Sequence, residues 1–164
     1  MRRRKIASTA LAAVLAAGIL WAGGTPAASA AGPCGSGYTK IASYPVTIAG
    51  DASTTFIKKF GPRGTKIGSL DVYWSASAKK NCAVHTAVGS TRGVKLQRYV
   101  GIQVAGQTKW SQDKGVYASY AGPVYTVAQR PGQCINVEAH VFEKSASGGL
   151  RSAAGTGRYR VHCG

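Results

Sequence analysis

Acidic residues are scarce in this chain, and the sequence motifs of known catalytic sites are missing from it. Five Asp and Glu stand against 21 Lys and Arg in 164 residues, which gives a formal net charge of +16. The chain has no G-x-S-x-G turn for a serine nucleophile, no histidines at metal-ligand spacing and no G-x-x-x-x-G-K-S/T phosphate loop. We therefore expect a protein that is not an enzyme and that has no catalytic residues, cofactor or metal.

A long apolar run occurs only once, near the start of the chain. Residues 2–5 are basic, residues 7–21 are mainly apolar, and Ala28-Ser29-Ala30 supplies the small residues that a signal peptidase needs. A run of this length falls short of the roughly 20 residues that cross a bilayer as a helix. The sequence predicts a secretory signal peptide over 1–30, a single secreted β-rich domain over 31–164, and no transmembrane segment.

Helical periodicity is also missing from residues 31–164, where short alternating segments are separated by Gly, Pro, Ser and Asn. This pattern predicts an all-β fold, a small disulfide-stapled sandwich or barrel of about 7–9 short antiparallel strands. Turns are expected at 61–64 and 130–132, and the Ser-, Ala- and Gly-rich segment 145–157 is expected to be a mobile loop. We expect strands at residues 39–48, 54–60, 67–75, 82–88, 94–104, 124–128, 135–142 and 158–163.

Two of these strands have a clear inner and outer row. In 135–142 the apolar residues occupy every second position, beginning with Ile135, and polar residues lie between them. In 158–163, the same rule puts Tyr159 on the core side, with Arg158 and Arg160 facing water. His140 and His162 then belong to the outer rows, where a solvated side chain is expected, whereas His85 near Cys82 is expected to have a structural role.

The four cysteines are too far apart in sequence to indicate a zinc site, which usually contains close pairs of thiols. An even number of cysteines in an exported chain predicts two disulfides, and three pairings are open. We favour Cys134 with Cys163, because these residues bracket the last strands, and hence Cys34 with Cys82. The alternation places Cys134 and Cys163 on opposite faces, so their bond requires a bulge, a sheet edge or strands that are not neighbours.

Aromatic residues are concentrated between 110 and 125. Rings on a rigid β scaffold can stack on sugars or bases, and nearby lysines can follow an anionic chain. The alternative is that these rings fill the core of a small β domain. The candidate ligand surface consists of Trp110, Lys114, Tyr117, Tyr120 and Tyr125.

Basic residues exceed acidic ones even without the leader, since residues 31–164 contain seventeen Lys and Arg and five Asp and Glu, a net charge of +12. A field of this sign attracts anionic envelope polymers or polysaccharide, and we do not expect nucleic acid as the physiological partner. The alternative is that the charge serves solubility and keeps the protein monomeric.

Five segments of the chain together match a known pattern: Asp71-Val72-Tyr73-Trp74-Ser75, Lys80-Asn81-Cys82-Ala83-Val84, Asp113-x-Gly115-x-Tyr117, Tyr120-Ala121-Gly122-Pro123-Val124-Tyr125 and Gly132-Gln133-Cys134-Ile135. In these segments the chain resembles the small secreted spore-associated protein A family of filamentous actinobacteria. The resemblance covers much of residues 34–137 and implies a secreted, cysteine-stapled protein that is found with the spore surface. It implies no established enzymatic activity and supplies no catalytic residue.

Three functions are compatible with these observations. The first is a secreted, non-enzymatic protein that associates with the cell or spore envelope and is held there by its basic charge. The second is a carbohydrate-binding module that uses the aromatic residues around 110–125. The third is a secreted inhibitor, for which the turn at 61–64 is a weak candidate for the exposed loop.

Overall fold

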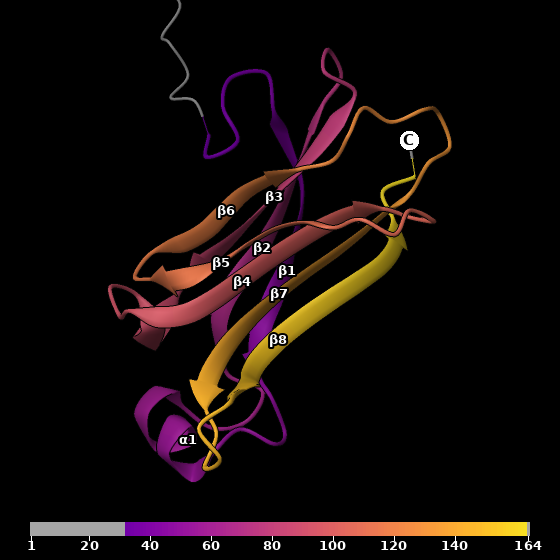
Figure 1. Cartoon of the computed structure of the whole chain (residues 1–164). Coiled ribbons are helices and arrows are strands. Elements are labelled where there is room, and N and C mark those ends of the chain that lie inside the picture. The colour runs from indigo at the N-terminus through magenta and orange to yellow at the C-terminus, as the bar shows by residue number, and fades with distance from the viewer. Residues whose placement is uncertain (1–31, 164) are drawn as a thin grey trace, which may run out of the picture.

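Eight antiparallel strands form one sheet that curls into a nearly closed barrel in the computed structural model, which describes residues 32–163 (Figure 1). The prediction of an all-β fold is confirmed, while the predicted signal peptide, 1–30, lies outside the described residues. Within 32–163, no helix has the length and hydropathy that a membrane crossing requires. The strands are β1 (Thr39–Ile48), β2 (Lys66–Ser75), β3 (Lys80–Ala87), β4 (Leu96–Val104), β5 (Ser111–Tyr117), β6 (Tyr120–Tyr125), β7 (Ile135–Lys144) and β8 (Leu150–Val161).

The strand order β5-β4-β7-β8-β1-β2-β3-β6 places β5 and β6, which are neighbours in the sequence, at the two edges of the sheet. These edges approach each other, and a side chain joins them in place of a backbone ladder. The Asp113 carboxylate accepts hydrogen bonds from the Gly122 backbone N–H and the Tyr117 hydroxyl, both at 2.7 Å. Asp113 thereby satisfies a donor that would otherwise lack a partner at the seam of the barrel.

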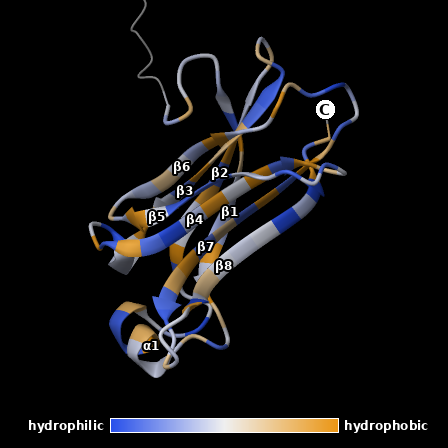
Figure 2. Ribbon diagram, viewed as in Figure 1, coloured by the Kyte–Doolittle hydropathy of each residue, from blue (hydrophilic) through white to orange (hydrophobic). Residues whose placement is uncertain are grey.

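The core fills the inside of the barrel, as the alternation along the strands predicts. Ile135, Val137, Ala139 and Val141 of β7 are all fully buried. Apolar and polar residues alternate along the strands in Figure 2. Alternation therefore determines which face of each strand packs inward.

The segment 54–60 was predicted as a strand, and this prediction is wrong, because it forms helix α1 (Thr54–Phe60). The Ser53 side chain accepts a hydrogen bond from the Phe56 N–H and so caps the first turn. Phe56 and Phe60, four residues apart, lie on the same face and are both buried. Gly61, at φ 123°, ends the helix.

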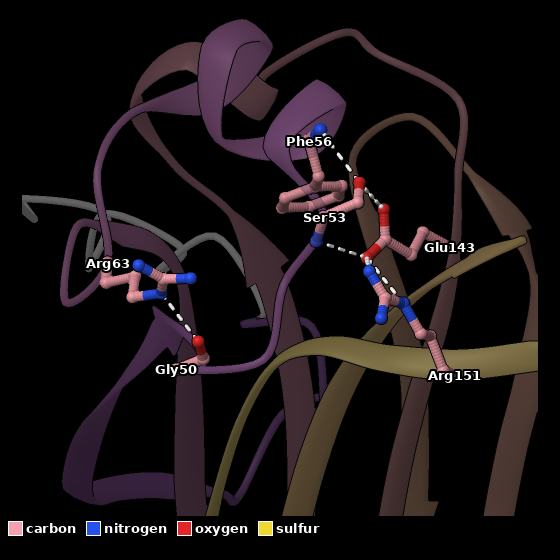
Figure 3. Close-up of polar contacts among 6 residues, drawn as sticks. All are labelled: Gly50, Ser53, Phe56, Arg63, Glu143 and Arg151. Atoms are coloured by element: carbon pink, nitrogen blue, oxygen red, sulfur yellow. Dashed lines mark hydrogen bonds and ion pairs between the residues drawn. The ribbon is translucent and has the colours of Figure 1, made fainter. Parts of the chain in front are cut away.

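Helix α1 covers one end of the barrel (Figure 1), and a polar cluster fastens it to the β7–β8 hairpin (Figure 3). The Glu143 carboxylate accepts hydrogen bonds from the Ser53 N–H and hydroxyl, and it forms an ion pair of 2.8 Å with Arg151. These contacts lower the pKa of Glu143, although its burial acts in the opposite direction. The cluster links the start of the helix to the hairpin.

The last third of the chain holds two further corrections. Residues 145–157 were expected to form a mobile loop, but β8 begins at Leu150, and only the five residues before it form the turn. The strand expected at 124–128 is instead β6, which ends at Tyr125. Strand β5 was not predicted, because its residues are mainly polar and Gly115 interrupts them. Gly122 and Pro123 in turn hid the start of β6.

The two disulfides are Cys34–Cys82 and Cys134–Cys163, the pairs that the sequence favoured. The second joins the ends of neighbouring strands beside a bulge, which is one of the three arrangements that the alternation left open. Two residues of β8 between Arg158 and Val161 lie opposite a single residue of β7, and Arg160 has φ 53°. The bulge also turns Tyr159 outward, to 61% exposure, so the prediction that Tyr159 faces the core is wrong.

Candidate functional site

The five residues of the predicted ligand surface do not lie together. Trp110 and Lys114 share the outer face of the barrel with neighbouring strands. Tyr117 turns inward, packs against the core and donates its hydroxyl hydrogen to Asp113. Its pKa is raised mainly by that hydrogen bond.

Tyr120 and Tyr125 lie at opposite ends of β6 and are 51% and 37% exposed. The Tyr125 hydroxyl donates to the Cys34 carbonyl, and its ring meets Tyr38 edge-on at 5.6 Å. Tyr125 therefore belongs to the region around the first disulfide. A continuous surface from Trp110 to Tyr125 does not form.

Trp110 and Lys114 instead join four residues that the sequence analysis missed. The Lys114 ammonium lies 4.7 Å from the centre of the Phe142 ring. This surface continues from β7 to β4 through the rings of Phe142, His140 and Tyr99, whose centres lie 5.8–6.5 Å apart. We call the set the outer aromatic face; it consists of Tyr99, Trp110, Lys114, Glu138, His140 and Phe142.

Gly101 of β4 leaves room for the aromatic rings on this face. A Cβ atom at Gly101 would overlap the Tyr99 hydroxyl oxygen and would lie 3.1 Å from the Trp110 ring. Both rings therefore lie against the backbone of β4. Beside them is a shallow hollow of about 350 Å³. Its lining consists of Tyr99, Gln112, Lys114, Glu138, His140, Phe142 and Ser152.

Glu138 is the acidic group of the outer aromatic face. Its two carboxylate oxygens accept hydrogen bonds from the Tyr99 hydroxyl at 2.9 Å and the Tyr159 hydroxyl at 3.2 Å. Burial and the bond to Glu138 raise the pKa of Tyr99, and the same two causes act on Tyr159. Both phenols therefore remain donors and hold the carboxylate in place.

His140 was expected to be solvated, but it is half-buried. Its Nδ1 lies 3.0 Å from the Ser152 hydroxyl, and burial lowers its pKa. His162 likewise meets the Tyr44 hydroxyl through Nε2 at 2.9 Å. The outer aromatic face therefore offers rings, one ammonium group, one carboxylate and an uncharged imidazole, which can stack on a sugar and hydrogen-bond its hydroxyl groups.

His85 is fully buried inside the barrel. Its Nδ1 lies 3.2 Å from the Tyr99 carbonyl, so this nitrogen donates, while Nε2 points at Gly68 without a hydrogen-bond partner in the described part of the chain. Burial and the charge of Arg98 lower the pKa of His85 to about 4. The hydrogen bond from His85 to Tyr99 links β3 to β4 and agrees with the structural role expected for His85 from the sequence.

Arg98, also fully buried, donates from Nε to the Tyr117 carbonyl and from Nη2 to the Thr91 carbonyl, both at 3.2 Å. Backbone carbonyls thus take the place of a carboxylate partner for this charge.

Among residues 32–163, no cluster of three or more His, Cys, Asp or Glu has the arrangement of a metal site. Comparison with known proteins gives no match to a family model, to a curated protein or to a solved structure. The resemblance to the spore-associated protein A family therefore stays a prediction.

Proposed function

We propose that this is an extracellular, non-enzymatic protein that associates with the cell or spore envelope through its positive charge. One observation carries the proposal: in residues 32–163 only two of the seventeen Lys and Arg form ion pairs, Lys40 with Asp71 and Arg151 with Glu143. Apart from the buried Arg98, the other basic side chains reach solvent. Two disulfides are also typical of exported proteins.

The free cations are spread over the barrel. Lys58, Lys59 and Arg63 are exposed at the helix end, while Lys79 and Arg130 are exposed at the other end. Such a distribution suits contacts at many points with a flexible anionic polymer better than docking to one rigid partner. Because salt screens exposed charges, adhesion should weaken as the ionic strength rises.

Co-sedimentation with isolated cell walls tests this proposal. We expect the bound fraction to fall as NaCl rises from about 0.05 to about 0.5 M, a range over which the screening length falls severalfold. A variant with Lys66, Lys95, Lys109 and Lys144 changed to Gln should bind less at low salt, since these four side chains are exposed and form no ion pairs. The matched variant with Arg at the same positions should bind like the wild type. Binding that resists both salt and the Gln substitutions would overturn the proposal.

A second candidate function is carbohydrate binding, and the outer aromatic face favours it. Trp110 and Phe142 present rings at the shallow hollow, whose lining also carries the polar groups of Glu138 and His140, and this is the arrangement that sugar stacking needs. On a glycan array, Trp110→Ala and Phe142→Ala should each reduce the signal. Tyr120→Ala is the control, because Tyr120 is exposed on β6 outside this face. A wild-type protein without any glycan-specific signal would remove this candidate.

The inhibitor function has less support. The turn 61–64 is tied back to β1 through a hydrogen bond from the Gly64 N–H to the Ile48 carbonyl, and it closes on itself between Thr65 and Pro62. Protease inhibitors usually present an extended exposed loop, and this turn is not one. We therefore do not propose inhibition.

A further inference from the structure

The end of the barrel opposite helix α1 is open. Strands β1 and β8 pair only at Thr47–Gly155 and Ile48–Ala154, and beyond these pairs they diverge (Figure 1). The space between them and the segment after β6 contains a hollow of about 510 Å³. This volume lies within the 300–1,000 Å³ that small-molecule sites commonly have.

The walls of this hollow are mainly apolar. The apolar lining includes Trp74 of β2, Ile41 of β1, Pro131 and the Cys163 half of the second disulfide. Ile41 is 43% exposed, so the apolar surface is accessible from solvent. An apolar ring or short chain that entered the hollow would remove this surface from water.

One buried acceptor in the lining lacks a partner. Asn81 is 2% exposed, its backbone N–H donates to the Thr126 hydroxyl, and its side-chain NH₂ donates to the Gln129 side-chain oxygen. The Asn81 Oδ1 atom has no hydrogen-bond partner in the described structure. A buried polar atom without a partner is costly, so a ligand that carries an N–H or O–H group would gain from meeting it once a small shift of the side chain exposes the atom.

The orientation of the Asn81 amide follows from its neighbours. The Gln129 side-chain NH₂ donates to the Gln133 carbonyl at 3.4 Å. If the Asn81 amide were reversed, its oxygen would face the Gln129 oxygen. If the Gln129 amide were reversed as well, the Gln129 side-chain oxygen would face the Gln133 carbonyl oxygen, and both atoms are acceptors. The chain of amides therefore leaves Oδ1 of Asn81 as the free acceptor.

The rim of the hollow is cationic. Lys79 and Arg130 are exposed there, His162 lies beside them, and none of the lining residues is acidic. The His162 Nε2 atom is engaged by the Tyr44 hydroxyl, so the lysine and the arginine are the charges available to a ligand. An anionic group on a bound molecule would be attracted to this rim.

We infer that the open end of the barrel is a binding site for a small anionic amphiphile. Its apolar body packs between Trp74 and Pro131, a single N–H or O–H group donates to Asn81 Oδ1, and its carboxylate or sulfonate meets Lys79 and Arg130. The outer aromatic face and envelope adhesion are not required, so this inference goes beyond the proposed function.

Anilinonaphthalene sulfonate is a suitable probe, because it combines an aromatic body, one N–H donor and one anion. We expect saturable binding of one molecule per chain with enhanced fluorescence. The double variant Lys79→Gln/Arg130→Gln should bind about tenfold more weakly, as expected for loss of charge-assisted hydrogen bonds. The matched double variant Arg92→Gln/Lys109→Gln, which removes the same charge away from the hollow, should bind like the wild type, and so should Trp110→Ala.

The role of Asn81 is tested by changing the probe and not the residue, because substitution of this buried residue could unfold the protein. N-Methyl-anilinonaphthalene sulfonate keeps both aromatic rings and the anion but lacks the N–H group. We expect it to bind about tenfold more weakly than the anilino probe. Equal affinity for the two probes, equal weakening by the two double variants, or no saturable binding would overturn the inference.

Discussion

The two ends of the barrel are stabilised in different ways. At one end, helix α1 buries Phe56 and Phe60 against the core, and the Ser53–Glu143–Arg151 cluster holds the start of the helix. At the other end, β1 and β8 separate, and the Cys134–Cys163 bond joins β7 to the end of the chain. A covalent bond can hold strands together without filling the space beside them, so the open end keeps a hollow where the closed end has a packed core.

Removal of a buried ring at the closed end should have the largest effect. Phe60 is 5% exposed, and we expect Phe60→Ala to lower the free energy of unfolding by about 4 kcal/mol through lost burial and a cavity. Ile41→Ala at the open end should cost less than about 1 kcal/mol, because Ile41 is already 43% exposed. Urea denaturation measures both. Equal losses would show that the two ends do not differ in packing.

The second disulfide should come next in size. The bond closes a loop with a sequence separation of 29 residues. In the chain-entropy account, the double variant Cys134→Ala/Cys163→Ala should lower the free energy of unfolding by about 3.5 kcal/mol. The variant should also lose affinity for anilinonaphthalene sulfonate when measured well below its unfolding midpoint. Retention of wild-type affinity would mean that the bond does not shape the hollow.

The pH dependence of the free energy of unfolding tests the part of the barrel between its two ends, where His85 is buried. Its folded pKa of about 4 lies below the ordinary value of 6.5, so between these pH values the unfolded chain binds a proton that the folded protein does not. Stability from this group is complete above pH 6.5 and falls by about 3 kcal/mol as the pH drops to about 4.

Urea denaturation of the wild type and His85→Gln across this pH range measures the effect. The variant should lose less stability on acidification. The stability of the variant should still depend on pH, though less strongly, because burial also lowers the pKa values of His140 and His162. The same pH dependence in both proteins would contradict the role assigned to His85.

The smallest expected effect concerns the helix cap. Ser53→Ala removes the acceptor for the Phe56 N–H and one donor to Glu143, and it should cost about 1 kcal/mol. Thr54→Ala is the control, because Thr54 is exposed in the first turn and Ala favours the helix. If Thr54→Ala cost as much stability as Ser53→Ala, the cap would contribute nothing specific.

Helix α1 is an element that the sequence analysis predicted wrongly. Residues 54–60 contain enough apolar and β-branched residues to suggest a strand, but local signals favour a helix. Ser53 is a good N-cap, Phe56 and Phe60 are four residues apart, and Gly61 is a good stop signal. These signals were present in the sequence, so this helix could have been predicted.

The candidate sites were harder to predict. Alternation gives the inward row of β7 correctly, and the same pattern places Glu138, His140 and Phe142 on the outward row. It does not show that β4 and β5 bring Tyr99 and Trp110 beside them, because strand order depends on contacts between residues distant in the sequence. At the open end, the alternation around Cys134 and Cys163 left a bulge as one of three arrangements, and the structure shows it at Arg160. The early separation of β1 from β8 has no local sequence signature.

The most direct test of this account compares amide NMR spectra of the wild type and Cys134→Ala/Cys163→Ala under conditions where both are folded. The Ala105 N–H donates to the Cys134 carbonyl and the Gln129 N–H to the Lys79 carbonyl, so both amides report on the open end. The account predicts that these two signals shift or broaden, while those of Ile57 and Gly61 in and after helix α1 keep their positions. Changes of equal size at both ends, or none at the open end, would contradict it.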